Sequence, residues 1–389
     1  MNQMEELLIR GVDTIYPNIK ALEKRIENGK PLRVYIGVDP TGTKLHIGHS
    51  IGLSKLQEFA DAGHEAILLF GTGTVLVGDP SQRSEARKRI TEDEINENIK
   101  TWKEQVSKII DFEKVKVVQN SDWLLKLTLK DIIDIASNIT AVHLFKRESF
   151  QRRIDKGDTV WFHETMYPLL QGYDSVAMDV DLEIGGTDQT FNMLMGRELM
   201  QKMKGKEKFV LTTPMILGTD GQQMSKSTGN CIWLDDSPED MYGKIMSIPD
   251  AQIDSYAELL TNLSIEELKR EEPVNQKKKL ARAIVSKFHG VEKANLAQEH
   301  FEKTVQKGQV PDTIPTIQLP KAYSSMVRII ELLETAKLVS SKSEAKRLTQ
   351  QGGVEVDGKK ITDPNESIEV KNDMIIRAGK RKYIKIKIT

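Results

Sequence analysis

Cysteine is almost absent from this sequence, since Cys231 is the only one among 389 residues. A single cysteine cannot form a disulfide within the chain or a cysteine-rich metal site. We therefore expect neither a disulfide framework nor zinc, and no other protein-bound metal.

Long apolar runs are missing as well. The first residues carry acids early and lack the apolar core of a secretion signal, and runs such as residues 66–70 are far too short to span a membrane. The hydrophobic share of 39% and charged share of 29% are ordinary for globular proteins, so fibrous and disordered classes are not needed. We expect a cytosolic protein of two or three domains with no membrane partner.

Histidine is scarce, with seven in the chain, yet His46 and His49 lie within four residues of each other. Residues 32–38 predict a buried strand, and helical spacing begins at Ile47 after a Gly/Pro turn. The first turn of a helix has free N–H groups and a positive dipole end, and here it adds two imidazoles and the Thr41 hydroxyl at its approach. A lone histidine is usually structural, but this pair indicates a site for phosphate oxygens.

A second motif follows about 175 residues later. Residues 223–230 form a run of small residues with one well-placed lysine, Lys226. Such a loop could bring a cation to the same phosphates.

Further apolar runs end in polar or glycine-rich turns. They predict strands at residues 66–71, 115–118, 182–184 and 209–212. Helical and strand patterns alternate, which indicates a parallel α/β sheet whose ligands lie at the carboxyl ends of the strands. Asp79, Asn120 and the turn at residues 185–189 would then face one crevice, although Asp79 could simply form an Asp-Pro turn.

Tyr167, Gln171 and Asp174 have the spacing i, i+4, i+7 and therefore share one helical face. A polar stripe is usually solvated, but the flanking residues are apolar. We expect the stripe to be buried, with a bound amphipathic ligand supplying its partners.

The rest of the chain divides by composition. Residues 124–160 and 237–306 predict helices, and Pro311, Pro315 and Pro320 mark a linker without periodicity. Residues 337–389 carry thirteen Lys and Arg against seven Asp and Glu, a net charge of +6 that suggests an anionic polymer as partner. A second basic segment, at residues 146–153, could be a solvated face or an RNA contact, and the solvated face is favoured.

Together these motifs resemble class I aminoacyl-tRNA synthetases, and bacterial tyrosyl-tRNA synthetases in particular. The resemblance covers nearly the whole chain and is carried by Tyr35-x-Gly-x-Asp39, the His46–His49 motif, residues 78–81, the Tyr167 stripe, residues 185–189 and residues 224–227. It implies a Rossmann-like catalytic domain at residues 1–222 with a helical dimer-interface insertion at about 124–160. Residues 223–310 would be the signature loop and a helical anticodon-binding domain, 311–322 a linker, and 323–389 an RNA-binding domain similar to one in a small-subunit ribosomal protein.

The resemblance also implies roles for individual residues. The tyrosine pocket would comprise Tyr35 and Asp174 at the phenol, Asp79, Tyr167 and Gln171 at the ammonium group, and Asn120 and Gln189 completing it. ATP would be contacted by Asp39, Gly48, Asp188, Met224, Ser225, Lys226 and Ser227, and the catalytic groups around the pyrophosphate would be Thr41, His46, His49 and Lys226. Contacts to tRNA would come from Lys342, Lys346, Arg347, Arg377, Lys380, Arg381 and Lys382.

The implied reaction is the ligation of L-tyrosine to tRNA(Tyr) by a homodimer, with ATP as a substrate and Mg²⁺ arriving with it. In one departure from the family, Gln223 stands where a lysine is usual, so Lys226 would interact with more of the pyrophosphate charge. The alternatives are another nucleotidylyl transferase with His-x-Gly-His, a tryptophan synthetase, or a non-catalytic RNA-binding descendant of a synthetase. The Tyr35/Asp174 pair argues against the first two.

Overall fold

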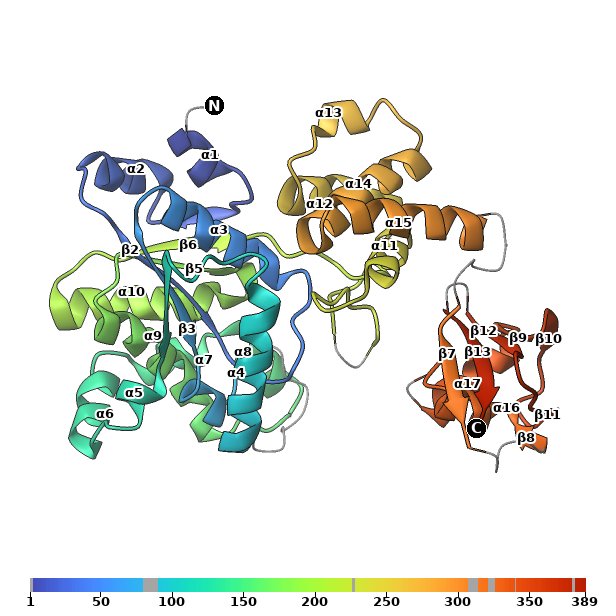
Figure 1. Cartoon of the computed structure of the whole chain (residues 1–389). Helices are drawn as coiled ribbons and strands as arrows, with labels where there is room; N and C mark the ends of the chain where they lie inside the picture. Colours follow the sequence, from blue (N-terminus) through green and yellow to red (C-terminus); the bar gives the residue numbers. More distant parts are fainter. Residues whose placement is uncertain are drawn as a thin grey trace. The chain divides into compact units, whose positions relative to one another are not determined.

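A computed structural model describes residues 3–79, 90–225, 228–306, 314–320, 326–339, 341–379 and 382–389 (Figure 1). The chain forms two compact units. The first comprises residues 1–235 and 247–276, and the second comprises residues 236–246 and 277–389.

A six-stranded sheet forms the centre of the first unit. Its strands, in the order β1-β6-β5-β2-β3-β4, are β1 (Thr14–Tyr16), β6 (Phe209–Thr213), β5 (Leu182–Gly186), β2 (Arg33–Val38), β3 (Glu65–Phe70) and β4 (Val115–Gln119). All neighbours are parallel except β1, which is antiparallel to β6. The predicted α/β class with a parallel sheet is confirmed, and so are the five predicted strands.

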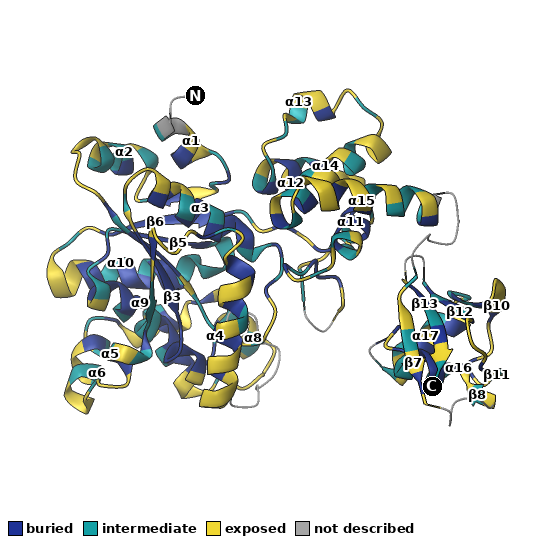
Figure 2. Ribbon diagram, viewed as in Figure 1, coloured by how far each residue is buried: buried dark blue, intermediate teal, exposed yellow. Residues whose placement is uncertain are grey.

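Helices cover both faces of this sheet, and its strands form the buried centre of the unit (Figure 2). Helix α3 (His49–Asp61) packs on one face, where Gly52 allows a close approach because a Cβ there would lie 2.6 Å from Ile36 Cδ1. On the other face, Tyr35 reaches Ser175 of α9 (Met166–Met178), and α10 (Thr190–Lys204) packs beside α9. The two side chains Tyr35 and Glu183 are register partners on β2 and β5 and therefore share this second face.

The remaining helices of residues 3–204 surround the sheet. They are α1 (Gln3–Ile9), α2 (Ile19–Glu27), α4 (Glu92–Val106), α5 (Ser121–Leu124), α6 (Leu129–Ala136), α7 (Ala141–Phe145) and α8 (Glu148–Asp155). Thr91 begins α4 with the predicted capping box to Glu94.

After the sheet the chain is helical, as expected from its capping signals. The helices are α11 (Pro238–Met246), α12 (Ile253–Leu260), α13 (Ile265–Leu268), α14 (Pro273–His289) and α15 (Val291–Phe301). Among the described residues, none of the helices combines the length and apolar character needed to cross a membrane.

The C-terminal residues form a small α/β fold. One sheet has the order β10-β9-β12-β13-β7, and a second pairs β11 with β8. Its elements are β7 (Thr316–Leu319), β8 (Met326–Arg328), α16 (Ile329–Thr335), α17 (Lys342–Gln350), β9 (Val354–Val356), β10 (Lys359–Ile361), β11 (Ser367–Glu369), β12 (Ile375–Ala378) and β13 (Lys382–Ile388).

The linker prediction at residues 311–322 is wrong for Thr316–Leu319, which form β7. This strand pairs in parallel with β13, and Leu319 is buried in the C-terminal core. The prolines at 315 and 320 bracket a strand too short to show periodicity. Residues 311–313, 321 and 322 of the predicted linker lie outside the described residues.

Candidate active site

The strand order reverses between β2 and β5, so the carboxyl ends of these two strands open a crevice at a topological switch point. Asp39 follows β2, Asn120 follows β4, and residues 187–189 follow β5 as a short 3₁₀ turn. These residues therefore lie at the carboxyl edge of the sheet, where parallel α/β sheets bind their ligands.

A chain of hydrogen bonds crosses the floor of this crevice. Asp39 accepts from the Thr74 hydroxyl at 2.8 Å and from the Tyr167 hydroxyl at 2.9 Å. Asn120 donates to Thr74 Oγ1 at 3.0 Å and accepts from the Gly73 N–H at 2.6 Å. Three strand ends and helix α9 are thus joined by one polar network.

Asp174 is the most deeply placed acid of this network, with 2% exposure. Its two carboxyl oxygens accept from Trp123 Nε1 at 2.8 Å and from Asn120 Nδ2 at 3.0 Å. Burial raises the pKa of Asp174 well above its usual range, although both donors oppose this shift. The expected burial of the α9 stripe holds for Tyr167 and Asp174, while Gln171 is half-buried.

Tyr35 is fully buried beside this acid. Its hydroxyl lies 3.0 Å from Ser175 Oγ, one residue beyond Asp174 on α9. Burial, followed by the charges of Glu183 and Asp174, raises the pKa of Tyr35 well above its usual value, so its phenol is neutral.

Asp79 is held by two side chains. Gln189 Nε2 donates to it at 2.9 Å, and Arg147 donates at 3.2 Å. Gln189 also bonds Asp188 at 3.2 Å. The preferred interpretation of residues 146–153 as a solvated face is therefore wrong for Arg147, which is 4% exposed because Asp79, Phe150 and Phe191 surround its guanidinium.

The two phosphate-site motifs are neighbours in the fold. Ile47 N–H donates to Ile232 O at 2.8 Å, Leu234 N–H donates to Leu45 O at 2.9 Å, and His46 bridges to Trp233. The motif at residues 46–49 is thereby fixed beside the strand-like segment that follows the loop at residues 223–230.

The histidine pair differs from its predicted setting in one respect. Helix α3 begins at His49 with Gly48 as its N-cap, so His46 lies before the helix and not in its first turn. The β-bridge between His46 and Trp233 keeps the backbone extended at His46. The two imidazole centroids are 3.9 Å apart, and His49 Nδ1 lies 3.1 Å from His46 O. Thr41 is exposed in the preceding turn, where its N–H donates to Asp39 O at 2.7 Å.

Asn230 organises the loop between β6 and this segment. Its side chain accepts from Ser225 N–H at 2.9 Å and donates to Gln223 O at 3.0 Å and Asp220 at 2.8 Å. Met224 is half-buried and Gln223 exposed, whereas Lys226 and Ser227 lie outside the described residues.

The predicted tRNA-contacting residues are spread over the C-terminal fold. Lys342, Lys346 and Arg347 are exposed on α17. Arg377 pairs with Glu355 at 3.2 Å, and Lys382 donates to Leu338 O at 3.0 Å, so these two also support the fold. Lys380 and Arg381 lie outside the described residues.

Several residues around the predicted site residues could not be predicted from the sequence. They are Thr74, Trp123, Arg147, Ser175, Glu183 and Lys208. Only Glu183 carried a signal, since a charged residue stood within an apolar strand.

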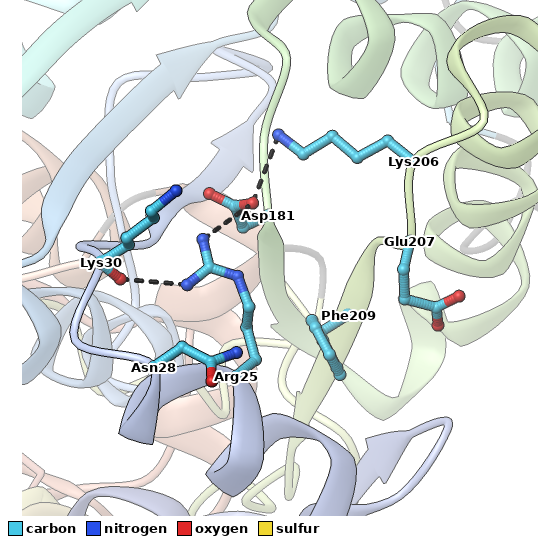
Figure 3. A pocket seen from close by; sticks show the side chains of 7 residues that line it. All are labelled: Arg25, Asn28, Lys30, Asp181, Lys206, Glu207 and Phe209. Carbon is cyan, nitrogen blue, oxygen red and sulfur yellow. Dashed lines mark hydrogen bonds and ion pairs between the residues drawn. The ribbon is translucent and has the colours of Figure 1, made fainter.

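A separate cavity of about 590 Å³ lies at the opposite, amino-terminal end of the strands (Figure 3). Arg25, Asn28, Lys30, Asp181, Lys206, Glu207 and Phe209 line it. Asp181 pairs with Arg25 at 3.5 Å and with Lys206 at 3.2 Å. The lining therefore mixes charges of both signs. Across the described ranges, no group of three or more His, Cys, Asp or Glu is arranged to hold a metal ion.

Comparisons with known proteins cover both ends of the chain. The family described as "tRNA synthetases class I (W and Y)" matches residues 27–306, and the "Tyrosine--tRNA ligase SYY-like C-terminal domain" matches residues 306–386. Among solved structures, the C-terminally truncated mitochondrial tyrosyl-tRNA synthetase of Aspergillus nidulans has a TM-score of 0.65 and 23% identity, covering 77% of this chain and 93% of that one. The tyrosyl-tRNA synthetase of Archaeoglobus fulgidus complexed with L-tyrosine has a TM-score of 0.61 and 23% identity, covering 76% and 99%. At this identity both support the fold alone.

Curated relatives are closer in sequence. The tyrosine–tRNA ligase of Thermotoga maritima is 42% identical over an alignment of 391 positions that covers 98% of this chain and 96% of that protein. That of Methylococcus capsulatus is 40% identical over an alignment of 398 positions that covers 100% of both chains. The chain therefore belongs to the class I tRNA synthetases, and within them to the tyrosine–tRNA ligases.

Proposed function

We propose that the crevice at the carboxyl ends of β2–β5 forms tyrosyl-adenylate from L-tyrosine and ATP, and that the same chain then transfers tyrosyl to tRNA(Tyr). The observation that carries this proposal is the buried acid Asp174 at the switch point, joined through Asn120 and Thr74 to Asp39 and Tyr167. A buried carboxylate beside a buried phenol suits a ligand that brings its own hydroxyl.

Tyrosine would lie along the face of α9. Asp174 and Tyr35 take its phenol, while Asp79, Tyr167 and Gln171 take its ammonium group. Asn120 and Gln189 complete the pocket by holding Asp174 and Asp79 through their amide groups. The proposed pocket is negatively charged where it binds the ammonium group and polar where it binds the phenol. This difference between its two ends fixes the orientation of tyrosine.

ATP would lie across the β2 end and the histidine motif. Asp39 and Asp188 serve the nucleotide and its ribose, together with Met224, Ser225 and Ser227. Gly48 allows a close approach, since a Cβ there would already lie 3.0 Å from the His46 ring. Thr41, His46, His49 and Lys226 are assigned to the leaving pyrophosphate, and Mg²⁺ enters with ATP as part of the substrate.

The reaction then requires the protein mainly to position tyrosine and ATP. The tyrosine carboxylate is ionised at pH 7 and attacks the α-phosphorus, while the bond from that phosphorus to the β-phosphate oxygen breaks. No protein base and no covalent enzyme intermediate are required. Donors fixed around the phosphates stabilise the charge that develops there. A hydroxyl of the terminal tRNA ribose next attacks the tyrosyl carbonyl, and AMP leaves.

Tyrosine-dependent exchange of labelled pyrophosphate into ATP, followed by charging of tRNA(Tyr), tests the proposal. We expect exchange with tyrosine and hardly any with tryptophan. RNA binding without exchange would instead favour a non-catalytic descendant of a synthetase.

Removal of the C-terminal fold should separate the two half-reactions. Because β7 pairs with β13, we would end the chain after residue 306 so that no unpaired strand remains. Adenylate formation should persist, since every group assigned to tyrosine and ATP precedes residue 231. Transfer to tRNA should weaken, and the lost affinity should be its salt-sensitive part, because phosphate contacts release counterions.

Measuring both half-reactions over a range of salt concentrations checks this expectation. An unchanged salt slope with full charging would argue against an RNA-binding role. Loss of adenylate formation would instead make this fold part of the catalytic body.

The helical insertion supports the proposed homodimer. Residues 125–162 expose several large apolar side chains, among them Leu129 at 76% and Val142 at 69%. This concentration of exposed apolar side chains within one insertion favours an interaction site, and a second copy is the partner proposed here.

Replacing Leu129 and Val142 together with aspartate should therefore convert dimer to monomer at micromolar concentrations in sedimentation equilibrium. Leu296→Asp is the matched control, because Leu296 is also exposed but lies on α15, outside the insertion. A wild-type monomer, or equal effects of both changes, would refute this interface.

A further inference from the structure

A buried ion pair contacts Gln171, one of the residues proposed to bind the ammonium group. Lys208 has no exposed surface, and Glu183 is 2% exposed. Lys208 Nζ donates to Glu183 and also to Met193 O at 3.1 Å. Neither charged residue belongs to the tyrosine or ATP site proposed above.

The second oxygen of Glu183 is bonded to Gln171 of α9. Gln171 Nε2 donates to Glu183 Oε1 at 3.2 Å. An ionised carboxylate can only accept hydrogen bonds, so it fixes which end of the amide faces it. If the amide were turned over, its oxygen would face the carboxylate oxygen and both would repel.

The other end of the Gln171 amide is its oxygen, which can accept a hydrogen bond from a ligand. Gln171 Oε1 is buried and has no hydrogen-bond partner among the described residues. A buried acceptor without a partner is costly unless a ligand supplies one. Gln171 shares its helical face with Tyr167 and Asp174, the residues that would lie along tyrosine.

We infer that Glu183, held in place by Lys208, is a positioning residue that turns the Gln171 amide oxygen toward the ammonium group of tyrosine. This inference rests on the proposed role of Gln171 as an ammonium ligand. The ion pair acts only on its immediate neighbours. Glu183 is the register partner of Tyr35 in the sheet, and Lys208 Nζ is 5.8 Å from the centre of the Tyr35 ring.

The energetics argue against a purely structural role. A buried ion pair stabilises a fold no better, as a rule, than apolar residues of similar volume. Burial lowers the pKa of Lys208, and the charge of Glu183 opposes that shift. Lys208 is the counterion that contacts the carboxylate at position 183, and orienting an amide is something that an apolar pair could not do.

Two double variants of the full chain isolate this hydrogen bond. E183L/K208M replaces the pair by apolar side chains and leaves no acceptor for Gln171. E183Q/K208M also removes both charges but keeps an amide oxygen at position 183. Single changes are avoided because they would leave one buried charge unpaired. Thermal melting establishes that both double variants fold.

Binding of two tyrosine fragments, measured by titration calorimetry, then reports on the ammonium group alone. Tyramine keeps the ammonium and the phenol, whereas 3-(4-hydroxyphenyl)propionate lacks the ammonium. In E183L/K208M we expect tyramine to bind roughly 10- to 100-fold more weakly, the scale of one hydrogen bond to a charged group, with the propionate nearly unchanged. E183Q/K208M should recover most of the tyramine affinity.

Equal weakening of both fragments would overturn the inference, because it would mean that the pair shapes the whole pocket. Equal tyramine loss in both double variants would overturn it too, since charge and not the acceptor would then matter. Gln171→Leu distinguishes the proposed role of Gln171 from the role inferred for Glu183. If this change does not weaken tyramine, the proposed role of Gln171 itself fails. If it does and E183L/K208M does not, only the role of Glu183 fails.

Discussion

Replacing His46 with alanine is expected to slow tyrosyl-adenylate formation by roughly 10²–10³ while tyrosine affinity stays near its wild-type value. His46 is fixed before any ligand arrives, through the backbone bridge to Trp233 and the close contact of its ring with His49. A donor placed in advance reorganises little when charge builds on the phosphates, and this is why its loss should appear in the rate.

Single-turnover formation of the adenylate and equilibrium binding of tyrosine measure the two quantities separately. His64→Ala is a suitable control, since His64 accepts from Leu32 N–H at 3.2 Å and belongs to none of the proposed sites. This control should change stability and leave the rate near wild type. A tenfold loss of tyrosine binding at an unchanged rate would remove His46 from the phosphate site.

Local patterns predicted the parts of the site that depend on local geometry. The spacing of Tyr167, Gln171 and Asp174 placed them on one face of α9, and the ends of the apolar runs marked the carboxyl ends of the strands. Helical and strand periods are properties of a few consecutive residues, so a single sequence is enough to read them.

Partners that are distant in sequence could not be predicted in this way. Trp123 meets Asp174 across 51 residues, and Arg147 meets Asp79 across 68. The sequence of a basic run is the same whether all of its side chains are solvated or one of them is buried. The prediction that Arg147 is solvated was therefore wrong. Strand β1 was missed because three residues give no period, and it forms only because β6 offers an edge.

Replacing Asp174 with alanine should lower tyrosine activation by roughly 10²–10³, the scale of losing a hydrogen bond to a charged acceptor and burying an unpaired hydroxyl. Asp174 is the buried acceptor assigned to the substrate phenol. Activation of phenylalanine, which has no hydroxyl, should change far less. The variant should also be less stable, because Trp123 Nε1 and Asn120 Nδ2 lose the oxygens that they bond.

The raised pKa of Asp174 gives an independent check with a definite sign. Burial favours its protonated form, so on acidification the wild-type carboxylate takes up a proton at a higher pH than an ordinary aspartate does. The phenol of tyrosine donates to the ionised form, so tyrosine binding should weaken as the pH falls through this raised value, while phenylalanine binding should not follow it. Affinities of both amino acids measured across pH, together with kcat/KM of the Asp174→Ala variant for each, test the assignment. Equal losses for tyrosine and phenylalanine, with parallel pH profiles, would show that Asp174 supports the pocket without contacting the phenol.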